Sequence, residues 1–282
     1  MPRRPNRLTA VRTVLLATLT SGLIAGLSTG AQAATLPTLS VSVTASSIAV
    51  GAAPQSGAVN VVSTATGLKE GAVLLFALKP GVSAAEVVAF LATKASADPN
   101  TANRFGSIVF DTEVAAGHPV EAQTTLQSGQ YLALLASGEG PPKANAAFTV
   151  SAAAAPVALP APQAVERAID FGFKGPSTLH VGELVGFENE GFLVHMNLAL
   201  PAKSRKAAKR LAGALLAGKQ KQAEKLIAGP PVSFTGPVSS GAYQQMTLSA
   251  KPGWYVQVCF MQTQDGRDHA KLGMERVIKI AK

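Results

Sequence analysis

The stretch that decides the fold is GWYVQVCFMQTQDGRDHAKLGM at residues 253–274, close to the C-terminus. Its first residues, up to Cys259, are rich in valine and aromatic side chains, which predicts a β-strand. Asp265-Gly266 then marks a turn, His269 follows, and Met274 opens a final predicted strand. A thiol, an imidazole and a thioether therefore lie on one loop between two strands, where they can converge at one end of a sheet.

The rest of the chain carries short segments rich in Val, Thr, Leu and Phe, separated by Gly, Pro, Ser and Asn. This pattern is typical of an antiparallel β-sandwich. In the first half it predicts strands at Leu39–Val50, Ala58–Ala65, Ala72–Leu78, Gln130–Ala136 and Ala146–Ser151. In the second half it predicts strands at Ala164–Phe171, Leu179–Phe187, Phe192–Leu200, Tyr243–Ser249, Trp254–Met261 and Glu275–Ile280.

An alanine and proline stretch, SAAAAPVALPAP at residues 151–162, separates the two halves. It has no charge and no periodicity, which indicates an extended linker. We therefore predict one domain at residues 34–151, a linker at 152–162 and a second domain at 163–282.

The two halves also resemble each other in sequence. VLLFALKPG at Val73–Gly81 corresponds to HMNLALPAK at His195–Lys203, and LQSGQYLALLA at residues 126–136 corresponds to SAKPGWYVQVCF at residues 249–260. Each half has a helical segment between its two matching stretches: Ser83–Lys94, opened by the capping box Ser83-Ala-Ala-Glu86, and Ser204–Ala228. The fold expected is mainly β, with two tandem sandwiches that each carry an inserted helical arm.

The N-terminus has the composition of a secretory signal peptide. Four arginines precede the apolar run Thr13–Leu27, and Ala31-Gln32-Ala33 follows it. We expect cleavage after Ala33, so that the protein is exported to the periplasm, the cell envelope or the medium. No later stretch is apolar enough to span a bilayer. Because the chain has one cysteine, no internal disulfide can form.

Composition and charge narrow the possible functions. With 47% hydrophobic and 15% charged residues, the chain is neither disordered nor fibrous. Loss of the four arginines of the signal peptide lowers the formal charge from +9 to +5, an excess that favours anionic partners without requiring nucleic acid.

A second imidazole completes a plausible ligand set. His195 ends the segment FENEGFLVH at residues 187–195, on a strand that the repeated topology places near the cysteine strand. A thiolate, two imidazoles and a thioether are the ligands of a mononuclear blue-copper site, with the thioether in a weak axial position. The lone cysteine and the ordered set His, Cys, His, Met together point to metal binding.

Residues 163–282 resemble a cupredoxin of the plastocyanin and azurin type. The resemblance lies in Phe187-x-Asn189-x-Gly191-Phe192-x-x-His195 and in Gly253-x-Tyr255-x-x-x-Cys259-x₉-His269-x₄-Met274. The C-terminal stretch is also similar to exported cupredoxin-like proteins of bacteria. The resemblance implies one type 1 copper per chain, with His195, Cys259, His269 and Met274 as its ligands. It also implies two tandem cupredoxin-like domains.

The first half lacks the corresponding ligands. When the halves are aligned, Leu135 takes the place of Cys259 and Val73 takes the place of His195. We therefore expect the first domain to bind no copper in this way. His118 and His180 have no partner in the pattern and are expected to be structural or exposed.

The second helical segment is strongly basic. It carries Lys203, Arg205, Lys206, Lys209, Arg210, Lys219, Lys221 and Lys225 against the single acid Glu224. One interpretation is a solvated helix. The other is a docking surface for a redox partner or for an anionic component of the cell envelope.

We expect an exported carrier of single electrons, in which His269 is the ligand nearest to solvent. The alternatives are a metal-free envelope protein that binds a partner, and a copper storage or delivery protein. An enzyme is not favoured, because Val258 and Phe260 flank Cys259 where oxidases and nitrite reductases have histidines, and no hydrolase motif occurs.

Overall fold

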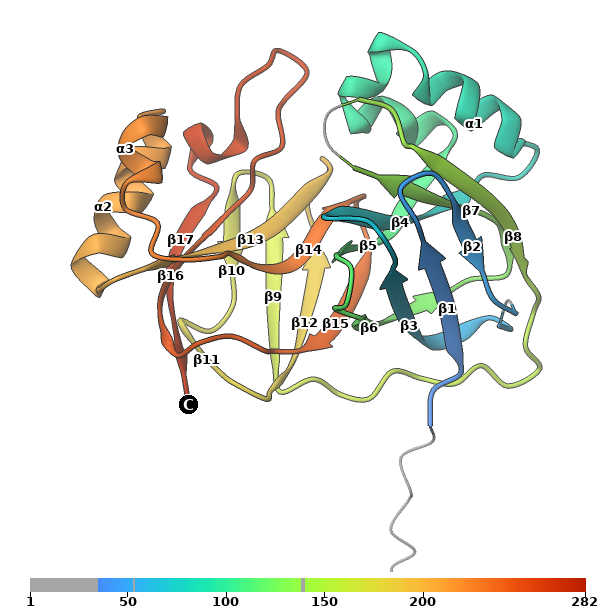
Figure 1. Ribbon diagram of the computed structural model, residues 1–282, viewed down its shortest axis with the longest axis horizontal. Coiled ribbons are helices and arrows are strands. Elements are labelled where there is room, and N and C mark those ends of the chain that lie inside the picture. Colours follow the sequence, from blue (N-terminus) through green and yellow to red (C-terminus); the bar gives the residue numbers. More distant parts are fainter. Residues whose placement is uncertain (1–34, 53, 138–139) are drawn as a thin grey trace, which may run out of the picture. The chain divides into compact units, whose positions relative to one another are not determined.

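The computed structural model describes residues 35–52, 54–137 and 140–282 of the chain. The predicted signal peptide lies outside these residues. Within them the chain forms seventeen strands in three sheets of eight, five and four strands (Figure 1). No helix in the described ranges is both long and apolar enough to cross a membrane.

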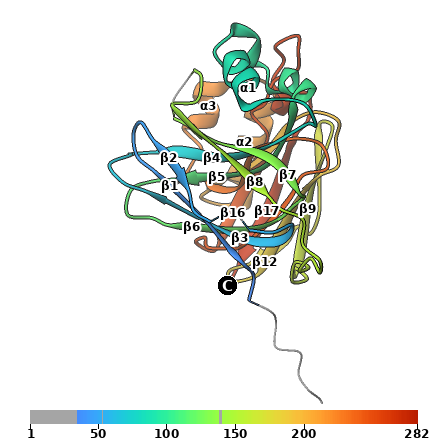
Figure 2. The same cartoon turned by 90° about the vertical axis from the view of Figure 1, so that its right-hand side faces the viewer.

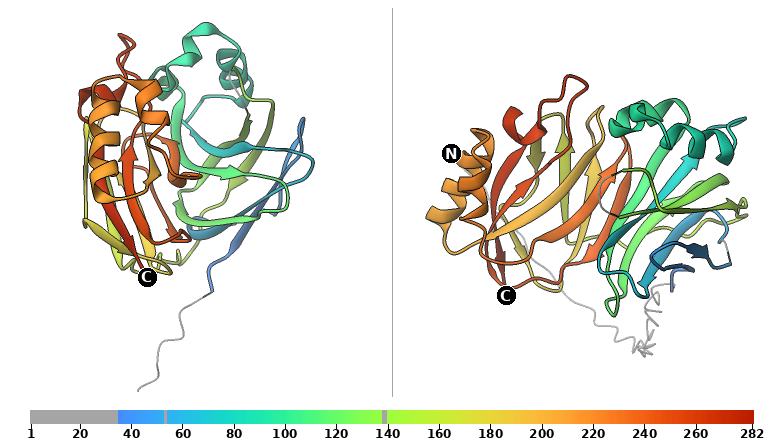
Figure 3. Two further views of the ribbon diagram at one scale, coloured as in Figure 1. Left: turned by 60° about the vertical axis from the view of Figure 1, so that its left-hand side comes forward. Right: turned by 45° about the horizontal axis from the view of Figure 1, so that its top comes forward.

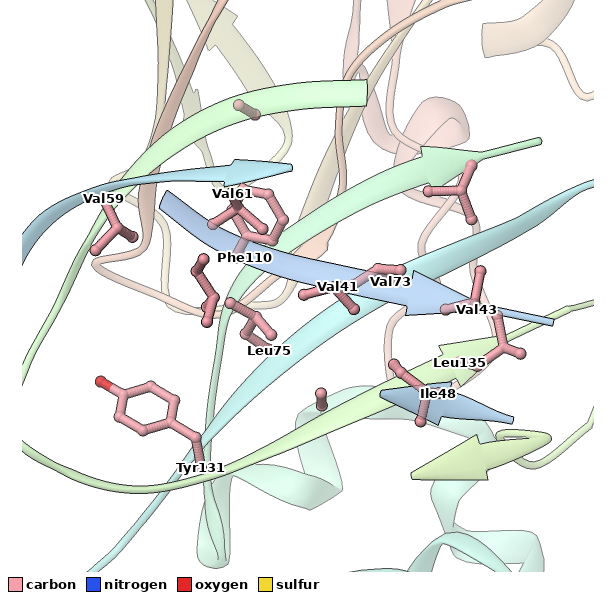
Figure 4. Close-up of a cluster of buried hydrophobic side chains, with 14 of the residues drawn as sticks. Val41, Val43, Ile48, Val59, Val61, Val73, Leu75, Phe110, Tyr131 and Leu135 are labelled. Atoms are coloured by element: carbon pink, nitrogen blue, oxygen red, sulfur yellow. The ribbon is translucent and has the colours of Figure 1, made fainter. Parts of the chain in front are cut away.

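The first half contributes strands to two of the sheets. Four strands lie in the eight-stranded sheet: β1 (Thr38–Val43), β2 (Ile48–Val50), β3 (Gly57–Ala65) and β6 (Val120–Leu126). Four others form the four-stranded sheet: β4 (Gly71–Leu78), β5 (Gly106–Val114), β7 (Gly129–Ala136) and β8 (Ala144–Val150). Alternate side chains of the two sheets meet in an apolar core that includes Val41, Val61, Leu75, Phe110 and Leu135 (Figure 4).

The second half is built in the same way. Its strands in the eight-stranded sheet are β9 (Ala164–Ile169), β10 (Gly172–Lys174), β12 (Leu184–Asn189) and β15 (Tyr243–Thr247). The five-stranded sheet consists of β11 (Thr178–His180), β13 (His195–Ala202), β14 (Val232–Val238), β16 (Gly253–Val258) and β17 (Glu275–Ala281).

Strand pairing repeats between the halves. In the first, β1 runs parallel to β3, β3 pairs with β6, and the other sheet has the order β5-β4-β7-β8. In the second, β9 runs parallel to β12, β12 pairs with β15, and the other sheet contains the order β14-β13-β16-β17. This common pairing is what a duplicated unit requires, while the domain boundaries themselves stay a prediction.

The halves share one sheet, which the sequence did not indicate. Strands β15 and β6 pair antiparallel, with Gln244 opposite Thr124 and Gln245 opposite Gln123. The Gln245 side-chain amide donates to Gln123 Oε1 at 2.8 Å, and Thr124 Oγ1 donates to the Tyr243 carbonyl at 2.7 Å. Each of these strands would otherwise leave an unpaired edge, and their pairing satisfies both.

Several predicted strands differ in detail. The segment Leu39–Val50 is a hairpin rather than one strand, because the chain turns where the Thr44 amide donates to the Ser47 carbonyl. Leu179–Phe187 likewise divides into β11 and β12. Strands β5, β6, β10 and β14 were not predicted. Polar residues weaken the alternation in β5 and β6, and Gly236 and Pro237 interrupt it in β14.

Both predicted helical arms are present (Figures 2 and 3). The first consists of α1 (Ala84–Leu91), which opens with the predicted capping box, and the 3₁₀ turns η1 (Lys94–Ala97) and η2 (Pro99–Arg104). The second is divided into α2 (Arg205–Leu216) and α3 (Gln220–Glu224), because Gly218 between them has a φ of 65°. Its apolar face, which includes Leu211, packs in one cluster with Val256 of β16.

A buried acid lies where β5 meets β14. Both carboxyl oxygens of Asp111 lack a hydrogen-bond partner among the described residues, and a Cβ at Gly236 would lie 2.0 Å from one of them. The Asp111 backbone is held by the second half, because its amide donates to Gln244 Oε1 and its carbonyl accepts from Gln244 Nε2. Burial, and then the charge of Glu113, raise the pKa of Asp111 well above its ordinary value.

We expect Asp111→Asn to stabilise the protein at neutral pH. The raised pKa in the folded protein means that ionisation of Asp111 destabilises the fold. This destabilisation is absent below the pKa that Asp111 has in the unfolded chain, and it grows as the pH rises toward the pKa in the folded protein. The gain should therefore be near zero at pH 3 and about 1–3 kcal/mol at pH 7 in the free energy of unfolding by urea. Glu121→Gln, at an exposed carboxylate, is the control. A loss of stability at pH 7 would show that the ionised carboxylate is accommodated.

Candidate metal centre

The predicted ligands come from three separate segments. His195 is the first residue of β13, Cys259 directly follows β16, and His269 opens the 3₁₀ turn η3 (His269–Leu272). Strands β13 and β16 are antiparallel, with Leu198 opposite Val258. Their register therefore brings the start of β13 to the end of β16, so that His195 lies beside Cys259.

Three donor atoms converge. Cys259 Sγ lies 3.8 Å from His195 Nδ1 and 3.5 Å from His269 Nδ1, and the two Nδ1 atoms are 3.2 Å apart. All three side chains have no exposed surface. These separations match three donors that each lie about 2.0–2.3 Å from one ion, the usual range for bonds from imidazole nitrogen and thiolate sulfur to a metal. Among the described residues this is the one cluster of its kind.

Met274 belongs to the same buried region. Its backbone closes the loop, because the Cys259 amide donates to the Met274 carbonyl at 3.2 Å and the Met274 amide donates to the His269 carbonyl at 3.0 Å. Its side chain has no exposed surface and packs in one apolar cluster with Cys259. Gly273, with a φ of 104°, allows the tight turn between His269 and Met274.

A carboxylate that was not predicted holds His195 in place. Asp170 Oδ1 lies 2.9 Å from His195 Nε2 and also accepts from the amides of Phe192 and Leu193. Because the Nε2 proton is directed to Asp170, the Nδ1 lone pair of His195 faces Cys259. A Cβ at Gly191 would lie 2.5 Å from Asp170 Oδ1 and 2.7 Å from His195 Nε2, so only glycine fits there.

Burial sets the protonation of the ligands. It raises the pKa of the Cys259 thiol to about 11, against the backbone amides of Met196 and Met261, which lower it. It lowers the pKa of His269 to about 4, and the nearby His195 acts in the same direction. Burial also lowers the pKa of His195, although Asp170 opposes this. At neutral pH the site therefore holds a protonated thiol and two neutral imidazoles.

Asp170 itself is ionised. Burial raises the pKa of its carboxyl, but hydrogen bonds from His195 and from the amides of Phe192 and Leu193 outweigh this, and the pKa lies below its ordinary value. The negative charge beside His195 increases the basicity of that imidazole toward a cation.

The remaining predictions about histidine divide into two groups. His118 and His180 are exposed, as expected, and His180 pairs with Glu183 at 2.8 Å. His269 has no exposed surface, like the other three candidate ligands, so its place as the ligand nearest to solvent stays a prediction. Phe171, in the turn after Asp170, packs against it in a T-shaped arrangement, with the two ring centroids 5.3 Å apart.

Among its described residues the first half has no counterpart of the site. Val73 and Leu135 pair directly across β4 and β7, and both are fully buried apolar residues. The second half thus carries one site with the His, Cys, His, Met composition of a type 1 copper centre. The structure brings His195, Cys259 and His269 together as expected, while their role as copper ligands, with Met274, stays a prediction.

No family model matches the chain, and no match was found among curated proteins. Among solved structures, auracyanin from Roseiflexus castenholzii is 17% identical, with 42% of this chain and 95% of that chain covered and a TM-score of 0.26. Auracyanin A, a blue copper protein from Chloroflexus aurantiacus, is 20% identical over 42% and 96%, with a TM-score of 0.25. The copper-containing nitrite reductase from Thermus scotoductus is 10% identical over 87% and 68%, with a TM-score of 0.25.

Proposed function

We propose that this protein binds one copper ion through His195, Cys259 and His269, with Met274 as the weak axial ligand, and that it carries single electrons. The observation that supports this most directly is the convergence of one thiol and two imidazole nitrogens in a site without solvent access. Sulfur favours Cu(I) and imidazole serves both oxidation states, so this donor mixture suits an ion that alternates between them.

Copper, when bound, supplies the one-electron couple, and the chain supplies a fixed environment. Cys259 loses its proton to become a thiolate. Asp170 holds the His195 ring through Nε2, and the Phe171 ring covers His269. Because the ligands come from paired strands and a hydrogen-bonded loop, they have little freedom to rearrange when the charge of the site changes.

Full burial favours electron transfer over the alternative of copper delivery. A delivery site must release its ion to a partner, which requires that a ligand reach the surface. Here none of the four candidate ligands has exposed surface. Electrons, in contrast, can cross a thin layer of packed side chains without any opening of the site.

The direct test is addition of one equivalent of Cu(II) to the mature protein. We expect an intense visible absorption from thiolate-to-copper charge transfer and reversible bleaching by a one-electron reductant. A colourless protein that keeps a titratable thiol after copper addition would contradict the copper proposal and support the alternative of a metal-free binding protein.

The basic arm is the proposed docking surface for an anionic redox partner. All eight of its Lys and Arg side chains are exposed, and Arg205 lies over the ring of Trp254 in β16. The arm lies beside the metal centre, because a hollow of about 340 Å³ is lined both by Leu215 and Ile227 and by Phe260, the residue after Cys259. An anionic partner held by the arm would therefore lie near the thiolate ligand.

We expect electron transfer with an anionic partner to slow steeply as salt is raised, because the field of exposed charges reaches only about 10 Å at 0.1 M ionic strength. Replacing Lys206, Lys209 and Arg210 together by Glu should reduce the association rate constant by about tenfold or more at low salt, with the copper spectrum unchanged. Stopped-flow kinetics across a salt series would measure this. Rates that do not respond to salt or to the charge reversal would mean that the arm is only a solvated cover.

For localisation, we propose export through the predicted signal peptide at residues 1–33. Cell fractionation with N-terminal sequencing of the mature chain tests both the compartment and the cleavage after Ala33.

A further inference from the structure

Four successive backbone amides of the loop that precedes His195 donate to side chains. The Gly191 amide donates to Asn189 Oδ1, and the next two amides donate to Asp170. The last amide, that of Val194, donates to Asn100 Oδ1 at 2.7 Å. Asn100 lies in η2 of the first half, so the residue directly before His195 is held by the half that has no ligands.

Asn100 is oriented for this contact. Its side-chain Nδ2 and its backbone amide both donate to Asp98 Oδ1, at 2.8 and 2.9 Å. The amide nitrogen is thereby occupied, and the carbonyl oxygen is directed to Val194. Pro99 occupies the first position of η2 and restricts the backbone next to Asn100. The acceptor is therefore preorganised.

Apolar contacts extend from the same arm to the metal centre. Phe90 and Ala102 of the first-half arm belong to one continuous cluster with Cys259 and Met274, and Phe105, next to η2, packs against this cluster. Val194 has no exposed surface. Figure 1 shows the first-half arm and the loop between β16 and β17 at the same end of the described chain. Residues of both halves thus form the apolar cluster that contains Cys259 and Met274.

We propose that the ligand-free first half acts as the cover of the metal centre, with Asn100 as the positioning residue that fixes the loop at residues 189–194 and so the orientation of His195. The biological purpose of this cover rests on the proposed copper function, although the hydrogen bond between Val194 and Asn100 exists without metal. The proposal assigns a role to the first half, which has no metal ligands of its own.

The test compares Asn100→Ala with Asn103→Ala. Asn103 lies in the same turn and also contacts the second half, where Ser239 Oγ donates to its side-chain oxygen at 3.3 Å, but it does not touch the His195 loop. The metal-free readouts are hydrogen exchange at the Val194 amide and the rate at which a thiol reagent modifies Cys259. We expect Asn100→Ala to accelerate both about fivefold, the factor that a typical hydrogen bond supplies, and Asn103→Ala to leave both unchanged.

With copper loaded, Asn100→Ala should lower the Cu(II)/Cu(I) reduction potential, because water that enters the site stabilises the more highly charged ion. Asp98→Ala removes the acceptor of the Asn100 side-chain and backbone amides but keeps the bond to Val194. It should shift all readouts in the same direction by less, and it serves as the second variant if Asn100→Ala does not fold.

The outcomes separate the two proposals. If the wild-type protein binds no copper but the thiol rates differ as expected, the copper function fails and the cover stands. If copper binds normally and neither Asn100→Ala nor Asp98→Ala changes the thiol rate or the potential, the cover is wrong. Equal acceleration by Asn103→Ala would also overturn it, because the effect would then be a general loosening between the halves.

Discussion

Replacing Cys259 by serine is expected to abolish the visible absorption of the copper-loaded protein. Serine is nearly isosteric, so the fold should persist, but a hydroxyl is a hard ligand that stays protonated at neutral pH. Copper affinity should fall by more than the roughly 10- to 100-fold loss that follows when a group that hydrogen-bonds to a metal ligand is replaced. Competition with a chelator of known affinity, followed by absorption and by electron paramagnetic resonance, measures both effects.

The matched control for this substitution is His180→Ala. His180 is an exposed histidine outside the cluster, and its removal should leave spectrum and affinity unchanged. If Cys259→Ser keeps tight copper binding while His180→Ala loses it, the copper is held by surface imidazole and the buried cluster is not the site.

The second large effect is a rise in copper affinity with pH. The thiol of Cys259 has a pKa of about 11 in the metal-free protein, while His269, with a pKa of about 4, is already neutral above pH 5. At and above neutral pH His195 is also neutral, because burial lowers its pKa from the ordinary value of 6.5. Binding then displaces one proton, that of the thiol, and the association constant should rise about tenfold per pH unit between pH 7 and 9. In acid the dependence should steepen, because the imidazoles must also lose protons, His269 only below about pH 4.

Calorimetry in buffers of different ionisation enthalpy, corrected for copper binding to the buffer, would count the protons released. One proton per copper at pH 7 is the expected result, and Cys259→Ser should remove it. An association constant that does not change between pH 6 and 8 would mean that the thiolate already exists in the metal-free protein, so that burial does not control the thiol as inferred.

Local features of the sequence determined the identity of three candidate ligands. Cys259, His269 and Met274 lie within one loop, and their order and spacing follow from a single strand-loop-strand segment. The capping box at Ser83 is equally local, since a side chain and an amide three residues apart satisfy each other. The absence of ligands in the first half also follows from aligned positions, Val73 and Leu135.

Tertiary structure decided everything that depends on contacts between distant segments. Asp170 and His195 are 25 residues apart, and Asn100 and Val194 are 94 apart. Such contacts arise from strand register and from the packing of turns, and they leave no period in the sequence that could be recognised. The pairing of β6 with β15 and the burial of His269 under Phe171 have the same origin. The sequence thus specified which donor groups are present, because residue type and local spacing are written in it directly. Only the fold determined how those donors are oriented, protonated and shielded, because these properties depend on which distant side chains come to lie against them.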